Sequence, residues 1–314
     1  MRMAETFSVC SGTCIGSEHI GSGGVLSAGN NQDACAHHMQ PEYLAAVVCD
    51  GCSDRPDSGI GANLLARIFI DTVGACVVYE EGFISRLNDK MLGRMRAIVD
   101  ILGGSRKGVS QVADEIFLAT LVGVVMTPQS TKIVACGDGM WGLNGSVATL
   151  GPFESNEPPY LGYQVRDGRN PRNELKLVHQ IPTDEVNSVF IGSDGCAYLK
   201  THLSTFLTDG RFLQNPALMS RELRVLNQDK VSLDVDRGPQ SLTVRPTWKE
   251  RLLPDDTTLV VVKRKQRRIE APKKSGMRSA NQVQMKGQSA PDARSTGGNA
   301  SQSPLKEWLE SFLY

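Results

Sequence analysis

The chain has 314 residues, of which 40% are hydrophobic and 22% are charged, and its formal net charge at pH 7 is zero. This composition supports a substantial folded core in one domain or two, as in a globular enzyme. The longest uncharged apolar run, residues 116–126, is too short to span a bilayer, and the first residues lack the apolar stretch of a signal peptide, so we expect a cytoplasmic protein without a membrane span.

The chain begins with a predicted strand over residues 7–17, which is followed by His19 and a glycine-rich segment. The polar sequence Asn31-Gln32-Asp33 comes just before a second predicted strand. His37 and His38 would face opposite sides of that strand, so we do not expect them to bind one metal ion together.

The next predicted strand ends on an aspartate, and the same pattern recurs later in the chain. Its residues 44–49 are uncharged and end abruptly on Asp50-Gly51. This pattern is typical of a buried strand that delivers one carboxylate to the edge of a core. Two helices follow: the first is predicted to begin at Ser58 and to continue to Val73, and the second covers residues 83–102 and ends at a Gly-Gly pair.

The second half of the chain alternates strands and helices. Strands are predicted over residues 116–126, 131–137, 175–180, 186–192 and 257–262, and helices over 197–207 and 215–227. The short turn at 127–130 makes the strands on either side of it antiparallel. Residues 151–174 are interpreted as a long irregular lid or flap, and no element is predicted for the stretch that ends at Pro254. The order predicts an α+β fold, an α-β-β-α sandwich of two antiparallel β-sheets flanked by helices.

Acidic residues stand at four predicted strand ends. They are Asp50, Asp138, Asp194 and the pair Asp255-Asp256. A single Asp-Gly most often marks a turn, but a buried carboxylate without a partner costs several kcal/mol, and few Lys or Arg lie nearby in the sequence to compensate four of them. Oxygen ligands beside glycines favour Mg²⁺ or Mn²⁺ over zinc. The pattern therefore indicates a site for hard divalent cations.

The eight cysteines all precede residue 197, and several fall in predicted strands. Reduced, buried thiols fit this placement better than a disulfide framework. Cys49 and Cys52 have the spacing of a zinc or redox motif, but Asp50-Gly51 lies between them and no second such pair follows, so we do not expect a zinc site.

The end of the chain differs from the rest. Residues 264–314 contain ten Lys and Arg against four Asp and Glu, so this tail carries +6 and residues 1–263 carry −6. Residues 264–303 are predicted to be a basic disordered linker, and because no aromatic residue interleaves its charges, nucleic acid is not the expected partner. Residues 304–314 place apolar side chains on one face of a short amphipathic helix, which we expect to dock on the body of the protein or on a partner.

Six short motifs, taken in order, resemble the metal-dependent protein phosphatases of type 2C, and the resemblance is closer to the bacterial branch. They are Asn31-Gln32-Asp33, Asp50-Gly51, residues 119–123, Gly137-Asp138, Ser193-Asp194-Gly195 and Asp255-Asp256-Thr257-Thr258. The resemblance implies a phosphatase domain over residues 1–263, a two-sheet sandwich with metal ions at one edge of the sheets.

The resemblance also implies roles for individual residues. Asp50, Asp194 and Asp255 would form the catalytic centre. Asp50 would bridge two Mn²⁺ or Mg²⁺ ions, with the Gly51 carbonyl completing one site and Asp194 and Asp255 binding the second ion. Asp33 would reach a metal through water, and Asp138 with Asp194 would hold a third, weaker ion.

The sequence departs from the family at the groups that hold substrate. The Arg that many members carry five residues before the first Asp is Ala28 here, the frequent His after Asp-Gly is Cys52, and the usual Ser-Arg after the third Asp is Gly139-Met140. Arg55 is therefore a candidate phosphate contact, and His19 is a candidate general acid.

The function implied is metal-dependent hydrolysis of phosphoserine and phosphothreonine in proteins by an activated water, without a covalent intermediate. The substrate would be a phosphoprotein, and the partner a cognate Ser/Thr kinase or its target. The alternative is a catalytically silent phosphatase-like module that binds phosphoproteins or regulates them. A third hypothesis, an unrelated phosphodiesterase that acts on a nucleotide, is compatible with the antiparallel order of the strands.

Overall fold

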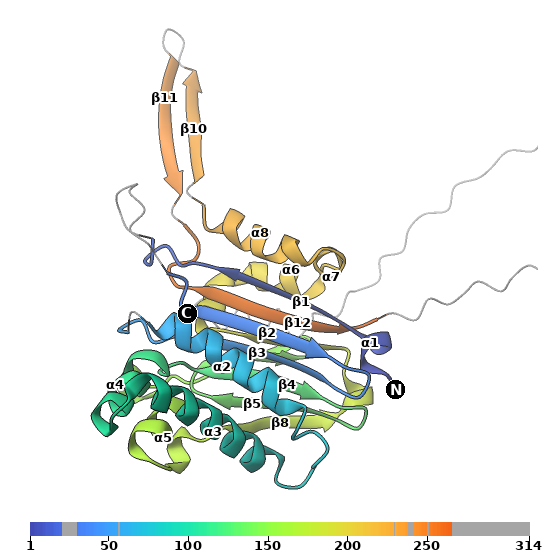
Figure 1. Ribbon diagram of the computed structural model, residues 1–314. Helices are drawn as coiled ribbons and strands as arrows, with labels where there is room; N and C mark the ends of the chain where they lie inside the picture. The colour runs from blue at the N-terminus through green and yellow to red at the C-terminus, as the bar shows by residue number, and fades with distance from the viewer. Residues whose placement is uncertain (21–29, 56, 229, 238–241, 250, 266–314) are drawn as a thin grey trace, which may run out of the picture.

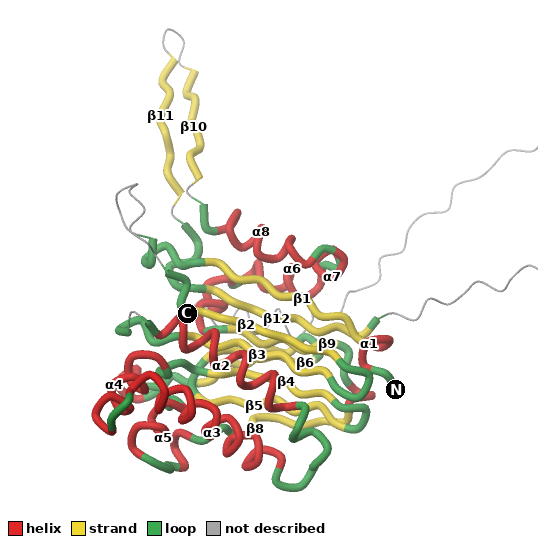
Figure 2. Tube along the Cα trace, viewed as in Figure 1, coloured by secondary structure: helices red, strands yellow, loops and turns green. Residues whose placement is uncertain are grey.

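The computed structural model describes residues 1–20, 30–55, 57–228, 230–237, 242–249 and 251–265. Two five-stranded antiparallel sheets stack face to face at the centre of the molecule (Figure 1; Figure 2). The first sheet has the order β1 (Phe7–Cys14), β12 (Thr257–Arg264), β9 (Ser188–Gly192), β6 (Gly139–Leu143) and β7 (Ser146–Leu150). The second has the order β2 (Asp33–Met39), β3 (Leu44–Asp50), β4 (Leu121–Met126), β5 (Ser130–Cys136) and β8 (Lys176–Pro182).

Helices cover the outer face of each sheet (Figure 1). The second sheet is covered by α2 (Ser58–Val73), α3 (Phe83–Gly103), α4 (Arg106–Ile116) and α5 (Leu161–Asp167). The first is covered by α6 (Thr201–Thr208), α7 (Arg211–Gln214) and α8 (Pro216–Leu226), and α1 (Met3–Thr6) leads into β1. Short 3₁₀ turns lie at η1 (Glu154–Asn156), η2 (Pro171–Asn173), η3 (Thr183–Glu185) and η4 (Asp194–Leu199). The α+β sandwich predicted from the sequence is confirmed.

Strand β3 is buried on both faces, which explains why polar and apolar residues do not alternate in its sequence. Ala45 and Val47 pack with the helices α2 and α3, whereas Ala46 and Val48 pack between the two sheets. Since side chains alternate across a strand, both faces of β3 are buried, and only its last residue, Asp50, is polar. The same double burial holds for β4, in which every residue is buried.

Several sequence predictions need correction. The strand predicted from residue 116 begins only at Leu121, because α4 runs to Ile116 and the segment 117–120 crosses to the sheet. The predicted irregular excursion at 151–174 contains the helix α5. The unassigned stretch before Pro254 contains β10 (Lys230–Arg237) and β11 (Leu242–Lys249), a two-stranded ribbon that projects from the sandwich (Figure 1).

Other predictions agree with the structure. The helices α2 and α3 begin at Ser58 and Phe83 as expected, and α3 ends before Gly104, whose φ of 62° is a left-handed conformation that glycine adopts readily. All eight cysteines are free thiols. No helix in the described ranges is long and apolar enough to cross a membrane. The predicted linker and C-terminal helix fall almost entirely in residues 266–314, outside the described residues, and stay predictions.

Candidate functional site

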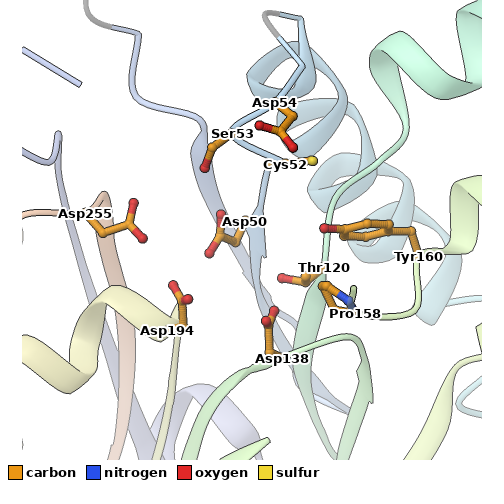
Figure 3. A pocket seen from close by; sticks show the side chains of 11 residues that line it. Asp50, Cys52, Ser53, Asp54, Thr120, Asp138, Pro158, Tyr160, Asp194 and Asp255 are labelled. Atoms are coloured by element: carbon orange, nitrogen blue, oxygen red, sulfur yellow. The ribbon is translucent and has the colours of Figure 1, made fainter. Parts of the chain in front are cut away.

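A polar pocket of about 210 Å³ lies at one edge of the sandwich, where the ends of strands from both sheets meet (Figure 3). Four aspartates predicted to lie at strand ends line it. They are Asp50, Asp138, Asp194 and Asp255. The remaining lining residues are Gly51, Cys52, Ser53, Asp54, Thr120, Pro158 and Tyr160. The structure thus brings together carboxylates that are up to 205 residues apart in the sequence.

The strand register accounts for this convergence. Asp50 ends β3 in one sheet, whereas Asp194 follows β9 and Asp255 precedes β12 in the other sheet, where β9 and β12 are paired neighbours. Asp138 lies where the chain passes from β5 in one sheet to β6 in the other. Gly137 on its N-terminal side has a φ of 99°, and a Cβ there would meet the Thr120 side chain at 2.7 Å, so the crossing requires glycine.

Asp33 does not line the pocket, and it pairs with Asp50 across β2 and β3. The Ser193 hydroxyl donates a hydrogen bond of 2.7 Å to its Oδ2, whereas its Oδ1 is buried without a hydrogen-bond partner. Burial, with the negative charge of Asp256 as a smaller cause, raises the pKa of Asp33 to about 7. A buried acceptor without a donor is costly, so this oxygen is suited to accept a hydrogen bond from a bound water or to bind a cation.

The aspartates of the pocket repel one another. Burial raises the pKa of Asp50 well above its usual range, and the charges of Asp33, Asp194 and Asp255 raise it further. Burial and the charge of Asp194 likewise raise the pKa of Asp138 to about 6 and that of Asp255 above its usual value. A nearby cation would favour the charged form of each carboxylate and so reverse these shifts.

The donors of this site fit a hard divalent cation. They are carboxylate oxygens from several strand ends, together with an unpartnered buried oxygen on Asp33. The position of Gly51 beside Asp50 requires glycine, because a Cβ there would meet the Ser58 hydroxyl at 2.8 Å and the Gln32 carbonyl at 2.9 Å. Within the described residues, no three His, Cys, Asp or Glu side chains converge on one point at metal-binding distance. The pocket is therefore suited to a divalent cation by the type and the charge of its donor atoms.

Asp256 has a role that the sequence did not reveal. Its buried carboxylate accepts hydrogen bonds from the backbone N–H groups of Gly16 (2.7 Å) and Gln32 (2.6 Å). The Gln32 side chain in turn donates to the Arg55 carbonyl at 2.8 Å. Asp256 thus fixes the segments that carry Asp33 and the loop after Asp50. The doublet Asp255-Asp256 was the only sequence signal, and it did not distinguish the two residues.

His19 and Arg55 both lie near the pocket but do not line it. The Nδ1 of His19 is 3.0 Å from the Asp256 carboxylate, and its Nε2 is 4.0 Å from that of Asp255. The side chain of Arg55 is exposed. Ala28, the position of the family's usual Arg, lies outside the described residues.

Tyr160 and Thr120 were missed as pocket residues by the sequence analysis. Tyr160 comes from the segment predicted to be irregular, and its ring is 7% exposed. The Thr120 backbone N–H donates to the Asp50 carbonyl at 2.8 Å, which places Thr120 beside the aspartates. In Figure 3 the hydroxyl ends of Tyr160 and Thr120 point toward the side of the pocket where Asp50 lies.

A family model matches most of the chain. The family model described as protein phosphatase 2C matches residues 15–232. A bacterial serine phosphatase is similar in structure, with 13% identity, coverage of 81% of this chain and 96% of that chain, and a TM-score of 0.45. The serine/threonine phosphatase Stp1 from Staphylococcus aureus has 12% identity, coverage of 84% and 97%, and a TM-score of 0.45.

A third similar structure is the catalytic domain of the serine/threonine protein phosphatase PstP in complex with two manganese ions. It has 14% identity, coverage of 82% of this chain and 98% of that chain, and a TM-score of 0.40. No curated protein matches the chain in a sequence search.

Proposed function

This chain belongs to the protein phosphatase 2C family of serine/threonine protein phosphatases, and from that premise we propose that it hydrolyses phosphoserine and phosphothreonine in proteins with the help of two Mn²⁺ or Mg²⁺ ions. The observation that supports the proposal best is the pocket in which Asp50, Asp138, Asp194 and Asp255 meet. Four carboxylates in one pocket would repel a phosphate dianion unless cations were bound between them.

We propose that Asp50 bridges the two cations, that the Gly51 carbonyl completes one site, and that Asp194 and Asp255 hold the second ion. Asp33 would act through a water, and Asp138 with Asp194 would hold a third, weaker ion. The ions, when bound, would supply the positive charge that neutralises the phosphoryl oxygens and lowers the pKa of the attacking water. The chain itself would hold the ions at the sheet edge through the register of its strands.

The residues around the aspartates limit how the substrate can be bound. The described lining of the pocket includes no Lys, Arg or His, so neutral donors and the bound ions would contact the phosphoryl group. The leaving alkoxide still needs a proton. We propose His19, which lies near Asp255, as a candidate source of that proton. We propose Arg55, which does not line the pocket, as a candidate contact of the substrate phosphate.

The test is hydrolysis of a phosphothreonine peptide by the full chain with Mn²⁺, with Mg²⁺ and with a chelator, beside Asp50→Ala and Asp194→Ala. We expect turnover that requires metal and is lost in both variants. Turnover that persists in the chelator, or in both variants, would contradict the proposed site.

A silent binding module is the second candidate, because the described part of the pocket has no cationic side chain and the family's usual His is Cys52. Such a module would bind the phosphothreonine peptide in calorimetry with Mn²⁺ but leave it intact during long incubation. Metal-dependent release of phosphate would exclude it.

We further propose a cytoplasmic location, a cognate Ser/Thr kinase or its target as partner, and docking through residues 304–314. Deletion of residues 303–314 tests the last point. It should change thermal stability or the partners recovered with the protein, and a chain unchanged in both respects would refute docking.

A further inference from the structure

The pocket has two chemically different walls (Figure 3). Strand-end aspartates form one wall. On the other side lie Cys52, Thr120, Pro158 and Tyr160, which we call the neutral wall, and the exposed Asp54 lies beside Cys52. A phosphoryl group bound beside the aspartates would face the neutral wall with oxygens that need hydrogen-bond donors. Among the described lining residues, those donors are hydroxyl, thiol and backbone N–H groups, since no cationic side chain is present.

Tyr160 is the most firmly placed side-chain donor of the neutral wall. It precedes α5, whose Leu161 is fully buried in the core. A Cβ on Gly162 would lie 2.3 Å from the Phe117 carbonyl oxygen, so α5 packs directly against the backbone that leads to β4. On the other side, the Cys136 thiol contacts the Pro159 carbonyl at 3.4 Å. The backbone of Tyr160 is therefore held by the end of β5 and by the segment before β4.

The side chain of Tyr160 is also fixed. Its ring is nearly buried and packs edge to face on Tyr163, with 5.4 Å between the ring centroids. Its hydroxyl end lies near the Cys52 thiol, and burial first and this contact second raise the pKa of Tyr160 above its usual value. The hydroxyl therefore stays protonated throughout the neutral pH range. Because a thiol is a weak acceptor, the hydroxyl keeps its donor capacity for a ligand.

Ser53 and Thr120 are the other hydroxyl groups of the pocket. Ser53 is exposed and lies in a turn, so water competes for its hydroxyl. Thr120 is buried, but its short side chain lies close to Asp50, where a cation or its ligands would occupy the space. Of the three hydroxyl groups in the described lining, that of Tyr160 is the one on a long, nearly buried side chain, and it reaches into the pocket from the side opposite Asp194 and Asp255.

We propose that Tyr160 is a catalytic residue of the phosphatase reaction, whose hydroxyl donates a hydrogen bond to a non-bridging oxygen of the bound phosphoryl group. The inference rests on the proposed function, because it takes a phosphoester as the ligand of the pocket. Tyr160 supplies from the neutral wall a contact that in many members of the family comes from an Arg, here replaced by Ala28. No bond to Tyr160 is formed or broken in this role.

The experiment compares Tyr160→Phe with the matched control Tyr163→Phe in the full chain with Mn²⁺. Tyr163 lies on the same segment and packs on the same ring but does not line the pocket. Two quantities are measured: kcat/KM for a phosphothreonine peptide, and the Kd of inorganic phosphate by calorimetry. Because a hydrogen bond to a charged group contributes about 1.5–3 kcal/mol, we expect Tyr160→Phe to lower kcat/KM roughly 10- to 100-fold and to weaken phosphate binding, whereas Tyr163→Phe changes neither.

Three results would overturn the inference. The first is a Tyr160→Phe protein with unchanged kcat/KM and unchanged phosphate affinity. The second is a loss of Mn²⁺ affinity in Tyr160→Phe that equals its loss of phosphate affinity, which would mean that the ring supports the metal ions instead of the phosphoryl group. The third is a larger loss on the peptide than on p-nitrophenyl phosphate, which would place the hydroxyl on the leaving oxygen.

Failure of the proposed function gives a different result. If the wild-type chain binds phosphate with Mn²⁺ but does not turn over the peptide, the phosphatase proposal fails, and weaker phosphate binding in Tyr160→Phe still supports the contact. If the wild-type chain binds no phosphate with Mn²⁺, the contact itself is refuted.

Discussion

The two walls of the pocket are built in different ways. The aspartates stand at the ends of paired strands, so their positions follow from the register of two sheets. The neutral wall comes from connecting segments, and Tyr160 is held by the close approach of α5 to the segment before β4, by the contact of Pro159 with Cys136, and by its packing on Tyr163. The first wall carries charge that demands cations, and the second offers neutral donors. The proposed metal site and the proposed substrate contacts therefore rest on separate structural supports and should be changeable separately.

The largest effect is expected from Asp50→Asn, which removes one charge from the centre of the aspartate wall. If Asp50 bridges two ions as proposed, its loss should cost several kcal/mol of transition-state stabilisation, so turnover should fall roughly 1,000-fold. The same change relieves repulsion from Asp33, Asp194 and Asp255, so the metal-free variant should melt at a higher temperature than the wild type. Asp57→Asn is the control, because Asp57 is exposed and does not line the pocket. A stability loss in Asp50→Asn without metal would contradict the repulsion.

The second prediction concerns pH and the aspartate wall without metal. Burial raises the pKa of Asp33 to about 7 and that of Asp138 to about 6. Carboxyl groups in an unfolded chain titrate near about 4, so between about pH 4 and pH 7 the folded state binds more protons than the unfolded state. Stability in chelator should therefore fall as pH rises through this window, by several degrees in Tm between pH 5 and pH 8.

Thermal melts in chelator and in Mn²⁺ would measure this dependence. The fall should be smaller in Asp33→Asn, which has one titrating group fewer, and smaller in saturating Mn²⁺, which favours the charged carboxylates. A Tm in chelator that rises from pH 5 to pH 8 would show that the carboxylates are not in mutual repulsion.

The sequence predicted the aspartate wall better than the neutral wall, for a physical reason. Asp50 and Asp194 each follow an uncharged run that reads as a buried strand, and strand ends from two stacked sheets meet at one edge. Tyr160 lies in a segment without a periodic pattern, so neither its helix nor its position could be read from spacing. Asp256 acts through the backbone of Gly16 and Gln32, about 240 and 224 residues away, and no local pattern reports such contacts.

The third prediction tests the support behind the aspartate wall. Asp256→Ala would leave the N–H groups of Gly16 and Gln32 buried without acceptors, which should cost about 1–3 kcal/mol of stability. Asp256→Asn keeps one acceptor oxygen and should lose less. Both variants should weaken Mn²⁺ binding, since Asp33 and Asp255 lie beside the displaced segments, and chemical denaturation with metal titration measures both effects. Equal stability of the wild type and Asp256→Ala would show that the two backbone groups find other partners.

The smallest effect is expected at Cys52, on the neutral wall. A thiol is a poor proton donor to an alkoxide, so Cys52→Ala should change kcat by less than about threefold. The backbone N–H of Cys52 donates to the Leu118 carbonyl at 2.9 Å, and this contact does not depend on the side chain, so the loop should keep its place.

Cys52→His tests proton donation at this position directly, because it restores the residue that many members of the family carry. If proton donation limits turnover, this variant should raise kcat a few-fold on the peptide but not on p-nitrophenyl phosphate, whose leaving group needs no proton. A tenfold fall in Cys52→Ala would instead assign the thiol a direct part in the reaction. In that case the neutral wall would contribute chemistry as well as hydrogen bonds, and the division between the two walls would have to be abandoned.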